Sequence, residues 1–544
     1  MNRSLPRLVI ALAFLASAPL LAQDLPPLDL NPVPVYGKRV VTLPKARKGE
    51  VIDTSLYQLP PTDVMLFGDR VSSLGGSGGA LPGYREYEAP LKTSYEASLG
   101  SYLSPRAMVS AEYIRKKFDV AADLDYRGTA GHIDSAKASS LLIGARGSLL
   151  IGDGIEPLRG LRVAGGFQHL GDGYFLYGNT RTRFDRSRTG NSGSVMLKSE
   201  EEIPFSYRIA FQLDGMSVAD TDVDTIRQAT STSPTLMVGL AGRIDSSWGF
   251  SGGMQFSSTS LRYTAATNTP TFFSFHGDAE WHPSRSLFLT GGLVVASGDN
   301  SDSGSSSLIM PRLSLRYEAS NVLSVFGWFA PELRAATYRD RIMAAPYVDR
   351  DIVLRPERVP VRLAAGGRLS LEGFTLEGRV FFERASNTPI VTALGLPGEL
   401  HYDYIASRTI GGMVSSRFLI TPRLTLDADA VIRSAVDSLS RALPMIPAVD
   451  LRARADFSLN REIDLFGSLL VQTEERTVLS DSAATTGELR LPMRFLLGAG
   501  GSYKVLENLS VFAEITNLLA SQYELWQNYS APRFEIRGGV KGTF

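Results

Sequence analysis

From Leu91 to the C-terminus, segments of about ten residues alternate apolar side chains with polar or small ones and then break at a turn. Successive side chains of a β-strand point to opposite faces, so residues two apart share a face. In residues 118–127, Phe118, Val120, Ala122, Leu124 and Tyr126 form one face, and Asp119, Ala121, Asp123, Asp125 and Arg127 form the other. The same division occurs in residues 361–371, 374–382 and 451–460. Each predicted strand has one face suited to lipid and one suited to water.

The strands of a soluble β-sandwich also alternate apolar and polar residues, so strand length is needed to distinguish a sandwich from a membrane barrel. The segments approach the roughly 9–11 residues that a tilted strand needs to cross a bilayer, against about 5–6 in soluble sheets. The pattern therefore favours a transmembrane sheet.

Short and long connections alternate along the chain, as in outer-membrane barrels with short periplasmic turns and longer outer loops. The short turns are predicted at residues 116–117, 203–204, 246–249, 283–286, 320–322, 372–373, 421–423, 461–462 and 506–508. The long loops are predicted at residues 171–187, 220–233, 297–307, 331–360, 384–408, 434–450 and 474–488. These breaks predict an all-β fold, a transmembrane antiparallel up-and-down β-barrel of about 22 strands.

The N-terminal residues have the pattern of a signal peptide. Arg3 and Arg7 precede an apolar run from Leu8 to Leu15, and small residues continue to Ala22. A membrane anchor is the alternative, but the apolar run is shorter than the roughly 20 residues that a spanning helix needs. We therefore expect a signal peptide at 1–22, a short irregular segment at 23–90 in the periplasm or the lumen, and the barrel at 91–544.

Composition excludes several classes of protein. The 56 basic and 56 acidic residues cancel, which argues against a nucleic-acid partner. Cysteine is absent, so neither disulfides nor thiolate metal sites are available. A closed sheet can hold such a chain together through backbone hydrogen bonds alone.

The last predicted strand ends on an aromatic residue. Phe534, Ile536, Val540 and Phe544 lie on its apolar face, together with glycines 538 and 542. This pattern resembles the signal by which the barrel-assembly machinery of the outer membrane recognises its clients, and we expect that machinery as a partner.

The segment before the last strand carries a more specific pattern. Residues 506–519 read LENLSVFAEITNLL, and Tyr523, Tyr529, Pro532 and Arg533 follow. This resembles the closing segment of TonB-dependent receptors, although Ser530-Ala531 replaces the first proline of the loop and the glycine before Arg533 is missing. The resemblance implies a 22-strand barrel, a final seam strand and uptake across the outer membrane. It also implies a folded plug domain, for which residues 23–90 are too short, so we expect a reduced or missing plug.

Two interpretations of residues 32–41 stay open. Val33, Pro34, Val35 and Tyr36, with the basic residues after them, resemble a TonB box, and an extended apolar segment can add as a strand to a partner's sheet edge. That implies the TonB energy-transducing complex as a partner. An ordinary linker would have the same composition.

Candidate chemistry in the barrel is sparse. His276 and His282 share a predicted strand face with Ser274, Asp278 and Glu280, a row that could bind a metal ion or a proton or could be polar lumen lining. A single strand does not supply converging metal ligands, so we expect no metal site. No nucleophile elbow and no helix to host one is found, so we expect no catalytic residues, no cofactor and no enzyme.

The longest predicted loop, residues 331–360, is the candidate for ligand binding. It carries the candidate residues Arg334, Tyr338, Arg339, Arg341, Tyr347 and Arg350. Such a mixture suits an anionic ligand or the phosphates of lipopolysaccharide, which with outer-membrane lipid is an expected partner. Interspersed carboxylates, Glu332, Asp340, Asp349, Asp351 and Glu357, leave open a loop that satisfies its own charges.

The sequence thus predicts a TonB-dependent-receptor-like outer-membrane protein for uptake or passage of a small solute. Two alternatives stay open: a passive porin-like channel, and a structural barrel that serves as a scaffold for a partner. The sequence does not identify the solute.

Overall fold

The computed structural model describes residues 91–544, apart from residues 116, 134–135, 152–159, 179–183, 200–204, 223–225, 264–266, 303, 394–399 and 477–489. The predicted signal peptide and the segment 23–90 lie outside the described residues. The predicted turn at 203–204 does as well, as does most of the predicted loop at 474–488.

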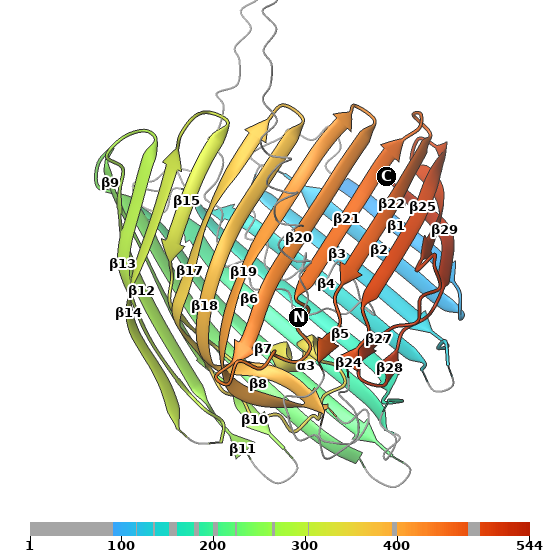
Figure 1. The fold of residues 1–544 in the computed structure, drawn as a ribbon, viewed down its shortest axis with the longest axis horizontal. Helices are drawn as coiled ribbons and strands as arrows, with labels where there is room; N and C mark the ends of the chain where they lie inside the picture. Colours follow the sequence, from blue (N-terminus) through green and yellow to red (C-terminus); the bar gives the residue numbers. More distant parts are fainter. Residues whose placement is uncertain are drawn as a thin grey trace, which may run out of the picture. The chain divides into compact units, whose positions relative to one another are not determined.

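The wall of the molecule is a ring of 22 strands (Figure 1). They are β1 (Leu91–Gly100), β2 (Ser104–Ile114), β3 (Phe118–Thr129), β4 (Ala138–Ile151), β5 (Leu161–Phe175), β6 (Asp185–Ser199), β7 (Phe205–Thr221), β8 (Ile226–Arg243), β9 (Trp248–Ser258), β12 (Thr271–Trp281), β13 (Leu287–Asp299), β14 (Ser305–Glu318), β15 (Leu323–Phe329), β17 (Glu357–Leu371), β18 (Phe374–Ala393), β19 (Leu400–Thr421), β20 (Leu424–Asp437), β21 (Val449–Ser458), β22 (Ile463–Gln472), β25 (Arg494–Leu506), β26 (Leu509–Thr516) and β29 (Glu535–Thr543). Each strand pairs antiparallel with its neighbours, which confirms the predicted fold class.

The ring closes where the last strand meets the first. β29 pairs with β1 from Ser94↔Thr543 to Gly100↔Arg537, and Phe544 exchanges two backbone hydrogen bonds with Thr93, of 2.8 and 2.9 Å. Gly539 lies in this seam, and a Cβ there would stand 2.4 Å from the carbonyl oxygen of Ala97. The predicted seam strand therefore removes the last free edge of the sheet.

Short elements extend the wall or fold beyond it. They are β10 (Ser260–Arg262), β11 (Thr267–Asn268), β16 (Glu332–Arg334), β23 (Glu475–Arg476), β24 (Arg490–Leu491), β27 (Glu524–Trp526), β28 (Tyr529–Ser530) and the helix α3 (Tyr338–Ala344). The helix corrects the expectation that the chain has none. Thr337 caps it by accepting a hydrogen bond from the Asp340 backbone N–H at 3.1 Å, and Tyr338 and Ile342, four residues apart, are both buried.

In the part of the chain that the structure describes, no helix has the length and apolar character needed to cross a bilayer.

The outer and inner faces of the wall follow the predicted alternation. On β3, Phe118, Val120, Leu124 and Tyr126 are exposed, Val120 by 52%, whereas Asp119 and Asp125 are half-buried on the inner face. Ile536, Val540 and Phe544 are likewise exposed on the outer face. Leucines, valines and phenylalanines exposed around the whole wall would be costly in water, so this belt lies in lipid.

Aromatic pairs mark one end of the belt. The pairs are Tyr95–Phe544, Tyr113–Phe118, Phe205–Phe250, Trp248–Trp281 and Phe374–Phe418, with ring centroids 4.6–5.8 Å apart. All lie at the end of the barrel where the short turns are, which we call the turn end. Girdles of this kind form at membrane–water interfaces.

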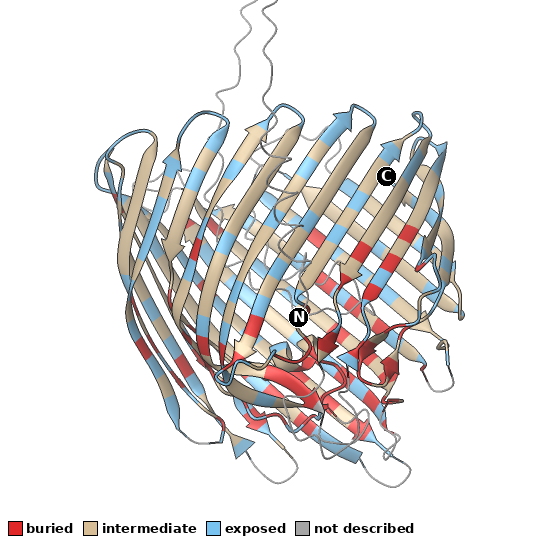
Figure 2. Cartoon of the chain, viewed as in Figure 1, coloured by how far each residue is buried: buried red, intermediate tan, exposed pale blue. Residues whose placement is uncertain are grey.

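The opposite end, which we call the loop end, departs from the sequence prediction. β18 and β19 run to Ala393 and from Leu400, so most of the predicted loop at 384–408 is strand. β7 and β8 likewise occupy most of the predicted loop at 220–233. Above the lipid both faces of a strand meet water or other loops, so the apolar–polar alternation ends before the strand does. Buried residues gather at this end (Figure 2).

A charge on the belt should destabilise the barrel. Val380 is 64% exposed in the middle of the outer face of β18, and Val380→Arg should cost about 2–4 kcal/mol of folding free energy. Ser415→Arg is the control, because Ser415 pairs with Glu377 and Asp429 on the inner face. Urea titrations of both variants in liposomes test this. Equal losses of stability would contradict the assignment of the faces.

Candidate functional site

Residues 330–356, between β15 and β17, fold into the barrel at its loop end. We call them the crossing segment. They contact the inner face of β6, which lies seven pairings from β15 around the wall: β6–β7, β7–β8, β8–β9, β9–β12, β12–β13, β13–β14 and β14–β15. The segment therefore occupies lumen space at the loop end, where α3 is seen in Figure 1.

Side chains of the wall hold the backbone of the crossing segment. Arg186 on β6 donates to the carbonyl oxygens of Pro346 (2.9 Å) and Val348 (2.5 Å). Arg188, two residues along on the same face, donates to the Ile342 carbonyl at 2.9 Å. These donors satisfy carbonyl groups that water cannot reach, and an unsatisfied one would cost about 1–3 kcal/mol.

Tyrosines do the same from other parts of the wall. The hydroxyl of Tyr174 on β5 donates to Pro346 O at 2.6 Å, and that of Tyr402 on β19 donates to Arg341 O at 2.8 Å. Tyr263 donates to Ile352 O. Donors thus reach the crossing segment from both sides of the lumen. Because it is held from two sides, the segment has a defined position in the lumen.

A buried charge network locks the segment to β6 and β7. Asp220 on β7 binds Arg186 with two hydrogen bonds of 2.6 and 2.8 Å, and it also accepts from Arg350 of the crossing segment at 3.0 Å. All three side chains are less than 10% exposed. A second buried pair, Arg188–Asp172 at 2.6 Å, lies beside it.

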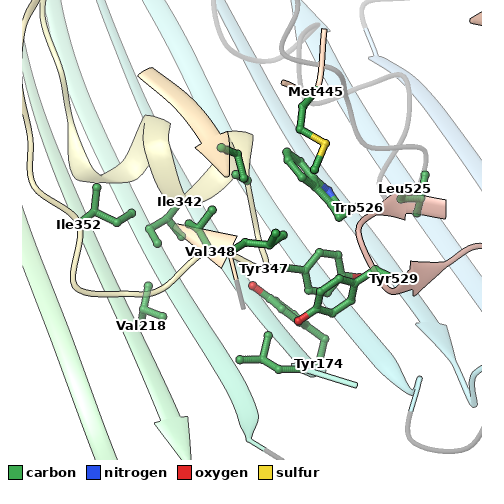
Figure 3. Packing of buried hydrophobic residues seen from close by; sticks show 14 of the residues in the cluster. Tyr174, Val218, Ile342, Tyr347, Val348, Ile352, Met445, Leu525, Trp526 and Tyr529 are labelled. Carbon is green, nitrogen blue, oxygen red and sulfur yellow. The ribbon is translucent and has the colours of Figure 1, made fainter. Parts of the chain in front are cut away.

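An aromatic cluster fills the space next to this network (Figure 3). The rings of Tyr347 and Tyr529 stack with centroids 3.8 Å apart, and Tyr174 meets Tyr347 edge-on at 5.7 Å. Tyr529 belongs to the loop between β26 and β29, so two distant loops join here. Burial raises the pKa of Tyr347 well above its usual value, so its hydroxyl stays neutral.

The six predicted ligand residues all contact other parts of the protein. Tyr338 is fully buried in α3 and donates to Arg350 O, Tyr347 lies in the aromatic cluster, and Arg350 lies in the charge network. Arg334 binds Glu332, Glu357 and Glu383, and Arg339 binds Asp214 and Gln168. Arg341 stacks over the Tyr402 ring at 5.8 Å. The structure brings them into one segment, but their described contacts are with the protein itself, as in the self-satisfied alternative.

The sequence pattern did not identify the residues that hold the crossing segment. Tyr174, Arg186 and Asp220 fall within predicted long loops, where position carries no face assignment. The signal that could have identified them is the continued period-two spacing of Asp172 and Tyr174 and of Arg186 and Arg188. It was obscured because the outer face there is no longer apolar.

Of the predicted histidine row, Ser274, His276, Asp278 and Glu280 lie on the inner face of β12, whereas His282 lies in the turn after that strand. Asp278 is occupied by Arg312 at 3.0 Å, and His276 packs against Gly253. No group of three or more metal-ligating side chains occurs among the described residues.

The TonB-box candidate at residues 33–36 lies outside the described part of the chain. Phe534 is exposed on the outer face, like the rest of the predicted assembly signal, and recognition of that signal stays a prediction.

No protein-family model and no curated protein matches this chain. Solved structures do share its fold. The FrpB iron transporter from Neisseria meningitidis (F3-3 variant) aligns with a TM-score of 0.68 and 10% identity over 84% of this chain and 82% of its own. The copper transporter OprC aligns with a TM-score of 0.66 and 11% identity, covering 85% and 81%. The ferric-catecholate import receptor Fiu from E. coli K12 aligns with a TM-score of 0.65 and 12% identity, covering 83% and 81%. These are TonB-dependent receptors with 22-strand barrels, so the barrel has the fold that the closing segment implied.

Removing the carboxylate of Asp220 should release the crossing segment. Asp220→Ala leaves Arg186 and Arg350 buried without a partner, which costs about 3–5 kcal/mol. We expect new tryptic cleavage at Arg339, Arg341 and Arg350, while the barrel keeps its heat-modifiable migration in electrophoresis.

Asp351→Ala is the matched control. It removes an exposed carboxylate 3.2 Å from the same Arg350 and should cost at most about 1 kcal/mol. A crossing segment that stays protected in Asp220→Ala would show that the charge network does not hold it.

Proposed function

We propose that this chain is an outer-membrane protein of the TonB-dependent-receptor type that takes part in uptake or passage of a small solute. The observation that carries the proposal is a closed 22-strand barrel whose lumen holds a built-in segment at one end. The proteins of similar fold are named as iron, copper and ferric-catecholate transporters or receptors, which supports transport rather than catalysis.

We also propose how the chain is oriented in the membrane. Residues 1–22 act as a signal peptide, residues 23–90 lie on the periplasmic side or in the lumen, and residues 91–544 span the outer membrane. The turn end faces the periplasm and the loop end faces outward, with lipopolysaccharide around it. The short connections at the turn end support this orientation, because short turns are periplasmic in barrels of this class.

A passive channel is the second candidate, and the crossing segment favours it. A loop folded inward narrows a lumen without any separate domain, and here it is held by wall side chains rather than by a ligand. In both candidates Arg341 is the proposed contact for an anionic solute, since it lies on the crossing segment and stacks on the ring of Tyr402, whereas Arg334 and Arg339 bind carboxylates.

Planar-bilayer recordings test the role of the crossing segment. Replacing residues 338–353 with a short Gly-Ser linker should raise the single-channel conductance, because the linker removes α3 and the aromatic ring of Tyr347 from the lumen. Constant conductance in the unaltered protein would support the passive channel. Conductance that is large and unchanged by the replacement would show that the segment does not limit passage.

The energy requirement is a separate test. Val35→Pro removes a backbone N–H and should abolish energised uptake, because strand addition to a partner needs that donor, whereas Val35→Ala keeps it. Uptake of iron chelates by cells expressing each variant, with and without the energising inner-membrane complex, measures this. Uptake that is unchanged in the Val35→Pro variant and in cells without the energising complex would contradict energised transport.

A further inference from the structure

The outer face of the barrel carries an apolar groove of about 590 Å³ over β9 and β12–β15. Its apolar lining includes Trp248, Ala279, Trp281, Gly291, Leu313 and Gly327, all on the outer face. Trp281, Leu313 and Leu315 are 41–57% exposed, so the groove opens outward.

The hollow arises from the order of side chains across the strands. Ala279 pairs with Gly291, and Gly291 pairs with Leu313, so two small residues stand beside a tall one. One row nearer the turns, Leu315 pairs with Gly327. A Cβ on Gly327 would meet no atom closer than 3.5 Å, so the space above it is empty rather than filled by a neighbour.

The groove has a defined depth in the membrane. Its turn-end rim is the stacked pair Trp248 and Trp281, with ring centroids 5.8 Å apart, which belongs to the aromatic girdle. Tryptophan rings sit at the level of lipid headgroups. The groove therefore begins at the headgroup level and runs into the apolar belt.

We propose that the groove binds one acyl chain of a glycerophospholipid from the turn-side leaflet. The lining is almost wholly apolar, and the belt around it already lies in lipid. Arg285, in the turn that follows Trp281, is exposed and has no ion-pair partner among the described residues, so a cation is available beside the headgroup level. The inference depends on membrane insertion of the barrel and not on transport.

Tryptophan quenching by brominated phospholipid tests the site. The purified full chain in detergent is titrated with phosphatidylglycerol brominated on one acyl chain, at ratios where annular lipid is replaced by detergent. We expect saturable quenching of Trp248 and Trp281 at low lipid-to-protein ratio. Gly327→Leu fills the groove and should raise the half-quenching ratio about ten-fold, since losing contact with roughly two methylene groups suffices.

Gly378→Leu is the matched control. Gly378 lies on the outer face of β18 with nothing within 4 Å of a Cβ, so the same substitution adds the same side chain outside the groove. It should leave the quenching curve unchanged. Ala279→Leu carries the test if Gly327→Leu does not fold, as judged by heat-modifiable migration.

Two results would overturn the proposal. One is linear quenching that is the same in the filled-groove variant and the unaltered protein, which indicates bulk partitioning only. The other is a dimer in analytical ultracentrifugation that Gly327→Leu disrupts, which indicates a second copy of the chain in the groove.

Discussion

A strand in a bilayer must place every backbone N–H and C=O in a hydrogen bond, because no water is available there to satisfy one. An open sheet cannot meet that condition at its two edges. In this chain the condition is met by β1 and β29, which lie more than four hundred residues apart in sequence and pair along Ser94–Gly100. The close contact at Gly539 shows that the seam leaves no room for a side chain there. Closure then fixes the lumen, and everything at the loop end is built on it.

The barrel wall passes through three environments, and the residue types on its faces differ in each. In the belt, residues such as Val120 face lipid and Asp119 faces the lumen. At the turn end, paired aromatic rings such as Trp248 and Trp281 mark the interface. At the loop end the outer face no longer meets lipid, and buried groups such as Asp172 and Arg188 pair instead. A strand can continue through all three because its ladder depends on the backbone and not on the side chains.

The crossing segment shows how a long loop is held without a core of its own. Its carbonyl groups are bound by Arg186, Arg188 and Tyr402, and its one buried cation, Arg350, is neutralised by Asp220 on the wall. Buried pairs of this kind add little net stability, but removing one partner is costly. The network therefore specifies where the segment lies more than how stable the barrel is. Any solute that enters from the loop end meets a surface already shaped by these contacts.

The sequence by itself determined the fold class, the strand number, the two faces of each strand and the seam, because lipid on one side and water on the other impose a period of two along the chain. Residues 118–127 and the last strand carried that signal clearly. Tertiary structure alone decided the strand ends at the loop side, the helix α3 and the role of Tyr174, Arg186 and Asp220. Their partners lie across the lumen, and contacts between residues so far apart leave no local period in the sequence. For the same reason the arginines of the longest loop and the carboxylates among them were identifiable as a group, whereas Asp214 and Asp220, their partners on the wall, were not.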